Sequence, residues 1–387
     1  MRWLAWVWMW VVCSACDGPS DAPSRPPADG RKAPPAAQGP PPGQPSAPAK
    51  EAATAQVATA AKGPATGQAP PTFRRQQEMM GTIIQITVVG EESPDRLAAV
   101  EAAFAEMRRV EALLSEWQPD SEISRINAAA GKRAVAVSEE TFRVVRAGLE
   151  VSRWSDGAFD MSWAALRGLY NFKPGQEKVP TKGELAERLP LIDYRAIELN
   201  ARRKTVHLKR TGMQLGTGGI GKGYALDRAA QLLKDAKVGS FMIFGGGQIQ
   251  LHGKKGNRPW RVGVQHPRRN DYFAFLEAES GSVSTSGDYE RAFMHEGKRI
   301  HHLIDPRTGQ PAAEASSVTV IAEQGLYADA VSTAIFIMGA ERALQLADTA
   351  PGGAQFLLLD EEQRVHTTPD MVDLLRFKTQ LVQGRVP

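Results

Sequence analysis

The sequence contains very little cysteine: Cys13 and Cys16 are the two cysteines among 387 residues. Because both lie near the amino terminus, the rest of the chain can form no disulfide and no cysteine-ligated metal site. The pair has the C-x-x-C spacing of redox proteins, but no thioredoxin-like strand and helix surround it, and cleavage of an amino-terminal signal would separate the two thiols. We therefore assign it no redox function.

Long hydrophobic runs are also missing. The apolar stretch "WLAWVWMWVV" is too short to cross a bilayer. With Arg2 before it and small residues after it, residues 1–16 have the composition of a secretory signal peptide. Ser14-Ala15-Cys16 resembles a bacterial lipobox, in which Cys16 becomes the lipidated first residue, and Asp17 favours retention in the inner membrane in some bacteria. We expect an exported lipoprotein that faces the periplasm and is anchored in the membrane by lipid.

Residues 17–72 lack the composition of a folded segment. They consist mainly of Ala, Pro, Gly, Gln, Ser and Lys, and no aromatic residue lies between Asp17 and Pro71. Such a segment cannot bury enough apolar surface to offset its chain entropy, so it predicts a disordered linker. Residues 73–387 remain as one folded domain without internal sequence repeats.

Several function classes have no support in the sequence. The net charge is only +4, and the short basic clusters contain no interleaved aromatic residues, which argues against binding of nucleic acid. Neither a G-x-S-x-G elbow of serine hydrolases nor an H-E-x-x-H zinc motif occurs. Nucleophilic serine catalysis and zinc-peptidase chemistry are therefore excluded as interpretations.

Helical and β-type periodicities alternate along residues 73–387 and predict an α+β, or mixed α/β, fold. We expect a single large domain, with two intertwined subdomains as the alternative. The predicted helices cover 94–114, 139–154, 222–236 and 327–348, with a short helix inside 119–127. The predicted strands cover 81–89, 240–251, 259–265, 273–285, 299–304, 316–322 and 354–360, with a hairpin over 196–209.

The stretch "GTGGIGKG", residues 216–223, matches two phosphate-binding patterns, and both matches are incomplete. As a P-loop it ends on Lys222, but Gly223 stands where a Ser or Thr should bind Mg²⁺. As a dinucleotide fingerprint it needs an acid about 20 positions later, and Asp235 is the nearest. A strongly helical segment follows, so the glycines should lie at a helix N-terminus, which favours an anion.

An acid and a hydroxyl lie at i and i+4 in the predicted helix over 327–348. Asp329 and Thr333 would share one helix face in an otherwise apolar segment, a geometry that suits Mg²⁺ with oxygen ligands. The alternative is structural: Asp329 caps the helix, and Thr333 bonds back to a carbonyl. Spacing alone leaves both open.

Three loops contain further candidates. In "HHLIDPRTG", His302 and Asp305 would form a base and its neighbouring acid, or the segment is a plain turn. "STSGDYER" contains Glu290 and "DGAFD" contains Asp160, and each is either a ligand-contacting loop or a simple turn.

Taken together and in order, these segments resemble the ApbE family of FAD:protein FMN transferases. The resemblance runs from Met80 to about Leu375. It is carried by seven motifs: "MGT" at 80–82, "SEISRIN" at 121–127, "GAFDMS" at 157–162, "GGIGKGYALD" at 218–227, "STSGDYER" at 284–291, "HLIDPRTG" at 302–309 and "ADAVSTA" at 328–334.

The resemblance implies a Mg²⁺-dependent enzyme that moves FMN from FAD to a Thr or Ser hydroxyl of a target flavoprotein and releases AMP. The metal ligands that the resemblance implies are the Gly219 carbonyl, Asp329 and Thr333. The FAD contacts that it implies are Met80, Asn127, Asp160, Lys222, Glu290 and His302. His302, with Asp305 as its partner or substitute, is the candidate base.

One position departs from the family pattern. Gly216 stands where the family usually has an Asp that helps to seat FAD, which puts the affinity for FAD in question. Two alternatives to the transferase remain. One is a Mg²⁺-dependent FAD pyrophosphatase that yields FMN and AMP, and the other is a non-catalytic FAD-binding lipoprotein.

Overall fold

The computed structural model describes residues 70–378, which belong to the unit Glu51–Pro387. The expected signal peptide, the lipidated Cys16 and nearly all of the expected linker lie outside the described residues. Strand β1 (Thr72–Met79) begins at the last residue of that linker. Among the described helices, none combines the length and apolar character needed to cross a bilayer.

An eight-stranded sheet in the order β1-β2-β6-β7-β10-β13-β14-β15 forms the centre of the fold, and each neighbouring pair is antiparallel. The strands after β1 are β2 (Thr82–Val89), β6 (Phe241–Gly245), β7 (Gln248–His252), β10 (Ser280–Gly287), β13 (Ser317–Ala322), β14 (Gln355–Leu359) and β15 (Val365–Thr367). A dinucleotide-binding unit needs parallel strands joined by crossover helices, so this sheet does not support the fingerprint interpretation of the glycine loop.

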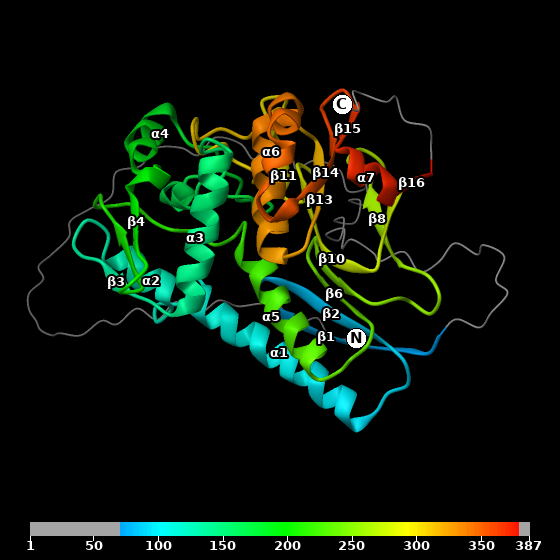
Figure 1. The fold of residues 1–387 in the computed structure, drawn as a ribbon. Helices are drawn as coiled ribbons and strands as arrows, with labels where there is room; N and C mark the ends of the chain where they lie inside the picture. The colour runs from blue at the N-terminus through cyan, green and yellow to red at the C-terminus, as the bar shows by residue number, and fades with distance from the viewer. Residues whose placement is uncertain (1–69, 379–387) are drawn as a thin grey trace, which may run out of the picture. The chain divides into compact units, whose positions relative to one another are not determined.

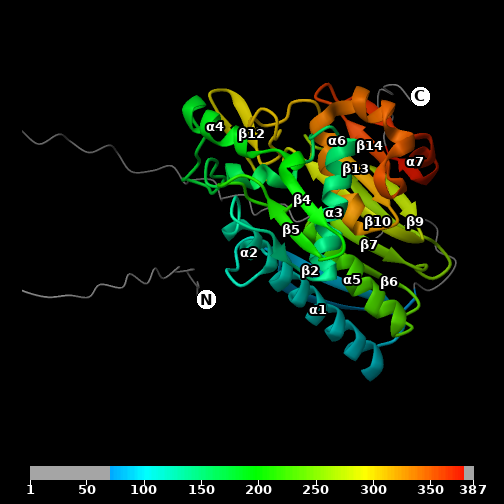
Figure 2. The same cartoon turned by 60° about the vertical axis from the view of Figure 1, so that its left-hand side comes forward.

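The sheet is buried on both faces, as the alternation along β6 shows. Phe241 and Ile243 point into one apolar cluster, and Met242 and Phe244 point into another. The first and larger cluster also holds residues of α1 (Pro94–Leu114), α3 (Glu139–Trp154), α5 (Gly221–Asp235) and α6 (Gly325–Gln345). Figures 1 and 2 show these four helices close to one another, with α5 beside both α1 and α6.

The second cluster lies between the other face and a small sheet of order β16-β9-β8. The remaining elements are short or peripheral. They are α2 (Glu122–Ala128), α4 (Lys182–Arg188), α7 (Pro369–Leu374), β3 (Val135–Ala136), β4 (Ile197–Asn200), β5 (Thr205–Leu208), β8 (Trp260–Gln265), β9 (Tyr272–Ala278), β11 (Ala292–His295), β12 (Lys298–His301), β16 (Leu375–Phe377), and the 3₁₀ turns η1 (Met161–Leu166), η2 (Leu189–Leu191), η3 (Tyr194–Ala196), η4 (Ala347–Thr349) and η5 (Pro351–Gly353).

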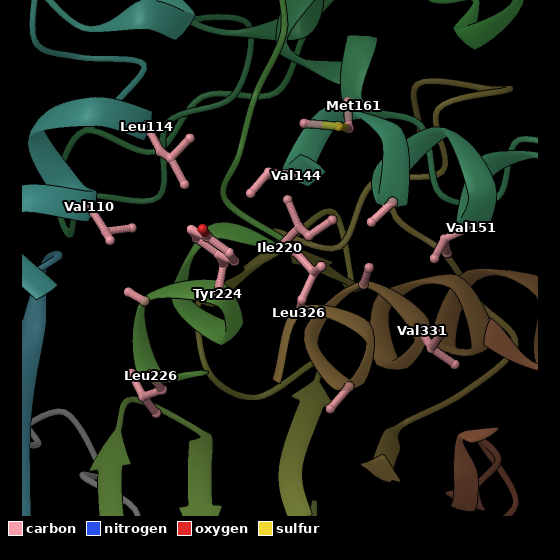
Figure 3. Packing of buried hydrophobic residues seen from close by; sticks show 14 of the residues in the cluster. Val110, Leu114, Val144, Val151, Met161, Ile220, Tyr224, Leu226, Leu326 and Val331 are labelled. Atoms are coloured by element: carbon pink, nitrogen blue, oxygen red, sulfur yellow. The ribbon is translucent and has the colours of Figure 1, made fainter. Parts of the chain in front are cut away.

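Figure 3 shows the packing at the start of α5. Ile220 and Tyr224 lie among Leu114 of α1, Val144 of α3 and Leu326 of α6. Since all five residues belong to one buried cluster, the glycine loop at the start of α5 is attached to the larger apolar core of the domain.

The α+β prediction is confirmed, and helices α1 and α3 have the predicted bounds. Ser93 and Ser138, which precede them, accept hydrogen bonds from the first turns, as N-cap residues do. The α6 prediction is close, since the helix covers Gly325–Gln345 with a non-helical Gly339 at φ 78°.

Two long predicted strands are wrong, because each is a pair of strands. The segment over 240–251 divides at Gly246-Gly247, whose φ angles of 55° and 86° form the tight turn between β6 and β7. The segment over 273–285 divides at Glu279 into β9 and β10. The predicted strand over 299–304 is shorter, ending at His301, and it pairs with β11, which was not predicted.

Candidate active site

The glycine loop is held at its first residues by hydrogen bonds from distant segments. Asn127 clamps the backbone of Leu215: its Oδ1 accepts from Leu215 N at 2.6 Å, and its Nδ2 donates to Leu215 O at 3.0 Å. Gly216 N donates to the Met161 carbonyl at 2.8 Å. Thr217 donates through Oγ1 to the Leu114 carbonyl, also at 2.8 Å. The amide of Asn127 thus holds the backbone just before the glycine loop, and its implied contact with FAD stays a prediction.

Helices α5 and α6 cross at two glycines. A Cβ placed on Gly223 would lie 1.9 Å from the Gly325 carbonyl oxygen, and a Cβ on Gly325 would lie 2.6 Å from the Gly223 carbonyl oxygen. No side chain fits at either position. A Ser or Thr at Gly223, which a P-loop requires, is therefore excluded by packing, and the P-loop interpretation is wrong.

Each of these helices contributes a carboxylate to the N-terminus of the other. Asp329 of α6 accepts a hydrogen bond from Gly223 N at 3.0 Å, in the first turn of α5. Asp227 of α5 accepts from Gly325 N at 2.7 Å and from Leu326 N at 2.9 Å, in the first turn of α6. The exchange satisfies backbone N–H groups that both helix starts would otherwise leave unpaired. Asp227 was not among the predicted site residues.

The structure corrects the capping alternative for Asp329. The N-cap residue of α6 is Gln324, so Asp329 lies inside its own helix and caps the neighbouring one. Thr333 Oγ1 does approach the Asp329 carbonyl, at 3.4 Å, as the structural alternative expected. Spacing within one helix could not distinguish these cases, because the partner N–H belongs to α5.

The three implied metal ligands lie together. A Cβ on Gly219 would lie 3.4 Å from Thr333 Oγ1, so the glycine loop contacts the Asp329–Thr333 face of α6. Asp329 is buried, which raises the pKa of its carboxyl, while Lys222 and the Gly223 N–H act in the opposite direction. A buried carboxylate with one N–H partner retains free lone pairs, and these suit a cation.

A hard cation would find oxygen ligands of the right kind here. One carboxylate, one hydroxyl and a backbone carbonyl are a Mg²⁺-type donor set, completed by water and phosphate oxygens. Nowhere in residues 70–378 do three His, Cys, Asp or Glu side chains gather into a metal-binding group. The oxygen donors around Asp329 thus fit Mg²⁺ by chemistry, as a donor set of mixed type.

Lys222 lies near enough to Asp329 and to Glu290 for its charge to act on both carboxyls. Lys222 Nζ donates to the Gly246 carbonyl at 3.2 Å, in the tight turn between β6 and β7. Burial is the larger effect and raises the pKa of Asp329, and the charge of Lys222 opposes that rise. This arrangement leaves a partly exposed lysine next to two acids and the glycine loop, where its ammonium can attract an anion.

His302 is partly buried, and the Nδ1 atom of its ring is buried. Its Nδ1 has no hydrogen-bond partner among the described residues, and its backbone N–H donates to the Arg291 carbonyl. Burial first, and then the charges of Arg291, His301 and Lys222, lower the pKa of His302 to about 3. The ring is therefore neutral at pH 7, in the proton-accepting form, but its basicity is far below the ordinary value near 6.5.

Asp305 does not serve His302 in this structure. Both of its carboxylate oxygens accept from the guanidinium of Arg307, at 2.8 Å for the closest atoms, and Oδ1 also accepts from Arg307 N. The expected pairing of acid and imidazole is not formed. "DPRTG" is instead the plain turn that was the alternative, with Gly309 at φ 70°.

Asp160 and Met80, two further implied FAD contacts, also make hydrogen bonds within the protein. Asp160 caps the short turn η1: its carboxylate accepts from Ser162 N at 2.7 Å, from Ser162 Oγ at 2.6 Å and from Tyr194 N at 2.8 Å. Met80 has a φ of 52° in the two-residue turn between β1 and β2, and its N–H donates to Glu111. Asp235, the acid of the fingerprint interpretation, binds the Gln231 amide at the far end of α5.

The strand β10 completes the surroundings of α6. Ser284 and Ser286 lie 3.2 Å and 2.9 Å from the hydroxyl of Ser332, which in turn donates to the Asp329 carbonyl. "STSGDYER" therefore begins as the end of a strand that contacts α6 at Ser332, and the segment with Glu290 follows it.

Comparison with known proteins places this geometry among flavin transferases. Residues 80–358 match the ApbE family. The FAD:protein FMN transferase of Treponema pallidum is 32% identical over 322 residues, covering 79% of this chain and 89% of that protein. One from Klebsiella pneumoniae is 31% identical over 297 residues, covering 74% of this chain and 84% of its own length.

Solved structures agree with this match. The ApbE protein of Thermotoga maritima superposes with a TM-score of 0.73 at 32% identity and covers 79% of this chain and all (100%) of its own. The apo form of the Pseudomonas stutzeri flavinyl transferase ApbE has a TM-score of 0.68 at 27% identity and covers 81% and 98%.

Proposed function

This chain belongs to the ApbE family, and from that premise we propose that it is a Mg²⁺-dependent FAD:protein FMN transferase. The acceptor is a Thr or Ser hydroxyl of a target flavoprotein, the product is a phosphoester, and AMP is released. The observation that carries the proposal is Asp329, a buried acid one helical turn before Thr333 whose carboxylate accepts a hydrogen bond from Gly223 N in the first turn of α5.

In the proposed reaction, the acceptor oxygen attacks the phosphorus of the FMN half of FAD. The P–O bond to the AMP half breaks, AMP leaves with the bond electrons, and the acceptor proton passes to a base. When bound by Gly219, Asp329 and Thr333, Mg²⁺ would neutralise charge on the pyrophosphate oxygens. The N-terminus of α5 and Lys222 would add positive potential on the same group.

His302 is the residue that we propose as the base. It is neutral at pH 7 because its pKa is about 3 in the absence of substrate, and part of that depression comes from the charge of Lys222. An anionic pyrophosphate beside Lys222 would oppose that charge and raise the basicity of the imidazole. Asp305 is bound to Arg307 and is left out of this role.

Product analysis tests the proposal against its alternatives. The full-length protein in detergent is incubated with FAD, Mg²⁺ and an acceptor flavoprotein domain carrying a Thr, and products are separated by mass spectrometry. Covalent FMN on the acceptor with one AMP per adduct supports the transferase. Free FMN and AMP without an adduct would identify a pyrophosphatase, and intact bound FAD would identify a binding protein.

We also propose that the enzyme is exported and lipid-anchored on the periplasmic side of the inner membrane. The support is the sequence of residues 1–17, with its apolar run and Cys16. Labelling with a radioactive or clickable fatty acid should mark the wild type but not Cys16→Ser. Equal labelling of both proteins would refute the anchor.

A further inference from the structure

A buried acid and a partly buried arginine lie beside the first residue of the glycine loop. Glu116 follows helix α1, and its side chain is only 7% exposed. Its Oε2 accepts a hydrogen bond from Thr217 N at 2.8 Å, and its Oε1 lies 3.2 Å from Nη2 of Arg167. Neither residue has a role in the function described above.

The carboxylate of Glu116 occupies the space that a side chain at Gly216 would need. A Cβ on Gly216 would lie 2.8 Å from Glu116 Oε2, 2.9 Å from Trp163 Nε1 and 3.0 Å from the Cβ of Ala164. Gly216 is not in the left-handed region, so its backbone conformation suits any residue. Space alone requires glycine here.

The position of the Glu116 carboxylate matters because Gly216 stands where the family usually has an Asp. A carboxylate is present at this point of the site after all, but it comes from Glu116, 101 residues earlier than the Thr217 that it holds. Since Gly216 frees the space and Glu116 fills it with the same functional group, the two residues form a matched pair.

The surroundings of Arg167 indicate which kind of ligand Glu116 and Gly216 help to bind. Its Nε is buried and has no hydrogen-bond acceptor among the described residues, and the one anionic partner of its Nη2 there is the Glu116 carboxylate, at 3.2 Å. Its guanidinium stacks on the ring of Trp117, with the ring centroid 4.6 Å away. Buried N–H groups without acceptors are costly in a folded protein, and an oxygen-rich anionic ligand would satisfy them.

We propose that Glu116 is a positioning residue of the FAD site, whose carboxylate replaces the side chain missing at Gly216. It acts through two neighbours: it accepts from Thr217 N–H, which sets the path of the glycine loop, and it orients Arg167, whose Nε–H donates to an oxygen of FAD. This inference rests on the proposed function, because FAD is the ligand that it assumes.

The test compares four proteins: the wild type, Glu116→Ala, Gly216→Asp and the double variant. FAD affinity is measured by quenching of flavin fluorescence with EDTA present, so that no turnover is needed, and Tm is recorded for each. We expect Glu116→Ala to raise the Kd for FAD about 10- to 100-fold, the range for loss of a charged hydrogen-bond partner. Gly216→Asp should also weaken binding, because two acids then compete for one space.

The double variant is decisive. Removing the Glu116 side chain relieves the tightest of the three contacts at Gly216, so that the aspartate introduced by Gly216→Asp can supply the carboxylate once Trp163, whose Nε1 would lie 2.9 Å from the new Cβ, shifts slightly. Binding tighter than that of Glu116→Ala supports the proposal. A double variant no better than Glu116→Ala, or a Glu116→Ala protein with wild-type affinity, overturns it.

Two additions keep the outcome specific. Glu341→Ala removes an exposed acid of α6 and should leave the Kd and Tm unchanged. Glu116→Gln keeps an acceptor for Thr217 N–H but loses the charge that faces Arg167, so an intermediate Kd is expected. A wild type that neither binds FAD nor transfers FMN refutes the proposed function, whereas normal transfer with an unaffected Glu116→Ala refutes only this inference.

Discussion

Replacement of Gly223 by alanine is the sharpest perturbation of the contact between α5 and α6. The new Cβ would lie 1.9 Å from the Gly325 carbonyl oxygen, 2.3 Å from the carbon of that carbonyl and 2.9 Å from the Cβ of Asp329. An ordinary contact needs well over 3 Å, so the helices must separate by roughly 1 Å. That movement displaces Asp329 from the Gly223 N–H that it accepts.

The energetic effects oppose one another, and the clash is larger. In an isolated helix, Gly→Ala stabilises by about 1 kcal/mol. Overpacking costs about 1–3 kcal/mol, and loss of a hydrogen bond to a charged group costs about 1.5–3 kcal/mol. The net loss should therefore be about 2–4 kcal/mol, which for a domain of this size lowers Tm by several degrees.

Thermal unfolding followed by circular dichroism measures this effect, with Gly183→Ala as the matched control. Gly183 lies inside helix α4, where a new Cβ would meet only Thr181 Oγ1, at 3.9 Å. That variant should keep the wild-type Tm, or its free energy of unfolding should rise by up to about 1 kcal/mol. A Gly223→Ala protein as stable as the wild type would refute the close crossing of the two helices.

Three further predictions concern Asp227, Thr333 and Asn127. Burial raises the pKa of Asp227 from 3.8 to about 6. Between these two pH values the folded protein holds a proton on Asp227 that the unfolded chain has lost, so the free energy of unfolding falls by up to about 3 kcal/mol as the pH rises from about 4 to 6. Asp227→Asn should remove this slope from Tm measured between pH 4 and 8, and an unchanged slope would contradict it. Thr333→Val should raise the Mg²⁺ concentration for half-maximal transfer roughly tenfold or more while Thr333→Ser stays near wild type, and equal requirements would exclude the hydroxyl as a ligand. Asn127→Asp sets a carboxylate oxygen against the Leu215 carbonyl and should destabilise the protein by about 1–3 kcal/mol in urea unfolding, whereas an unchanged midpoint would show that the clamp is dispensable.

Helix prediction from the sequence succeeded where periodicity and end signals agreed. Ser93-Pro94 and Ser138 mark the starts of α1 and α3, and the apolar spacing continues to the observed ends. Strand prediction failed where one apolar run holds two strands. Residues 240–251 read as one strand although Gly246-Gly247, whose positive φ angles make the hairpin, lies inside the run.

The site was predictable only as a list of residues. Asp329 and Thr333 share a helix face, as their spacing indicated, but the partner of Asp329 is Gly223, 106 residues away. Tertiary contacts of that kind leave no local pattern. Asp227 and Glu116 were missed for the same reason, since each acts on backbone N–H groups of a distant segment.

The role of single residues could also be misjudged from motifs alone. Gly223 looked like a defect in a P-loop, but it is a packing requirement set by Gly325. His302 and Asp305 are close in sequence, yet Arg307 holds the acid and the imidazole is left with an unused nitrogen. Burial and competing partners decide such roles, and neither can be read from residue spacing.

The most direct test of the account is a Mg²⁺ titration of FMN transfer to the acceptor, followed by intact-protein mass spectrometry, for wild type, Asp329→Ala and Asp235→Ala. Asp235 is a matched control, because it is an acid at the solvent-exposed end of α5. We predict saturable Mg²⁺-dependent transfer by wild type and Asp235→Ala, and none by a folded Asp329→Ala. Transfer by Asp329→Ala at the wild-type Mg²⁺ requirement would contradict the account.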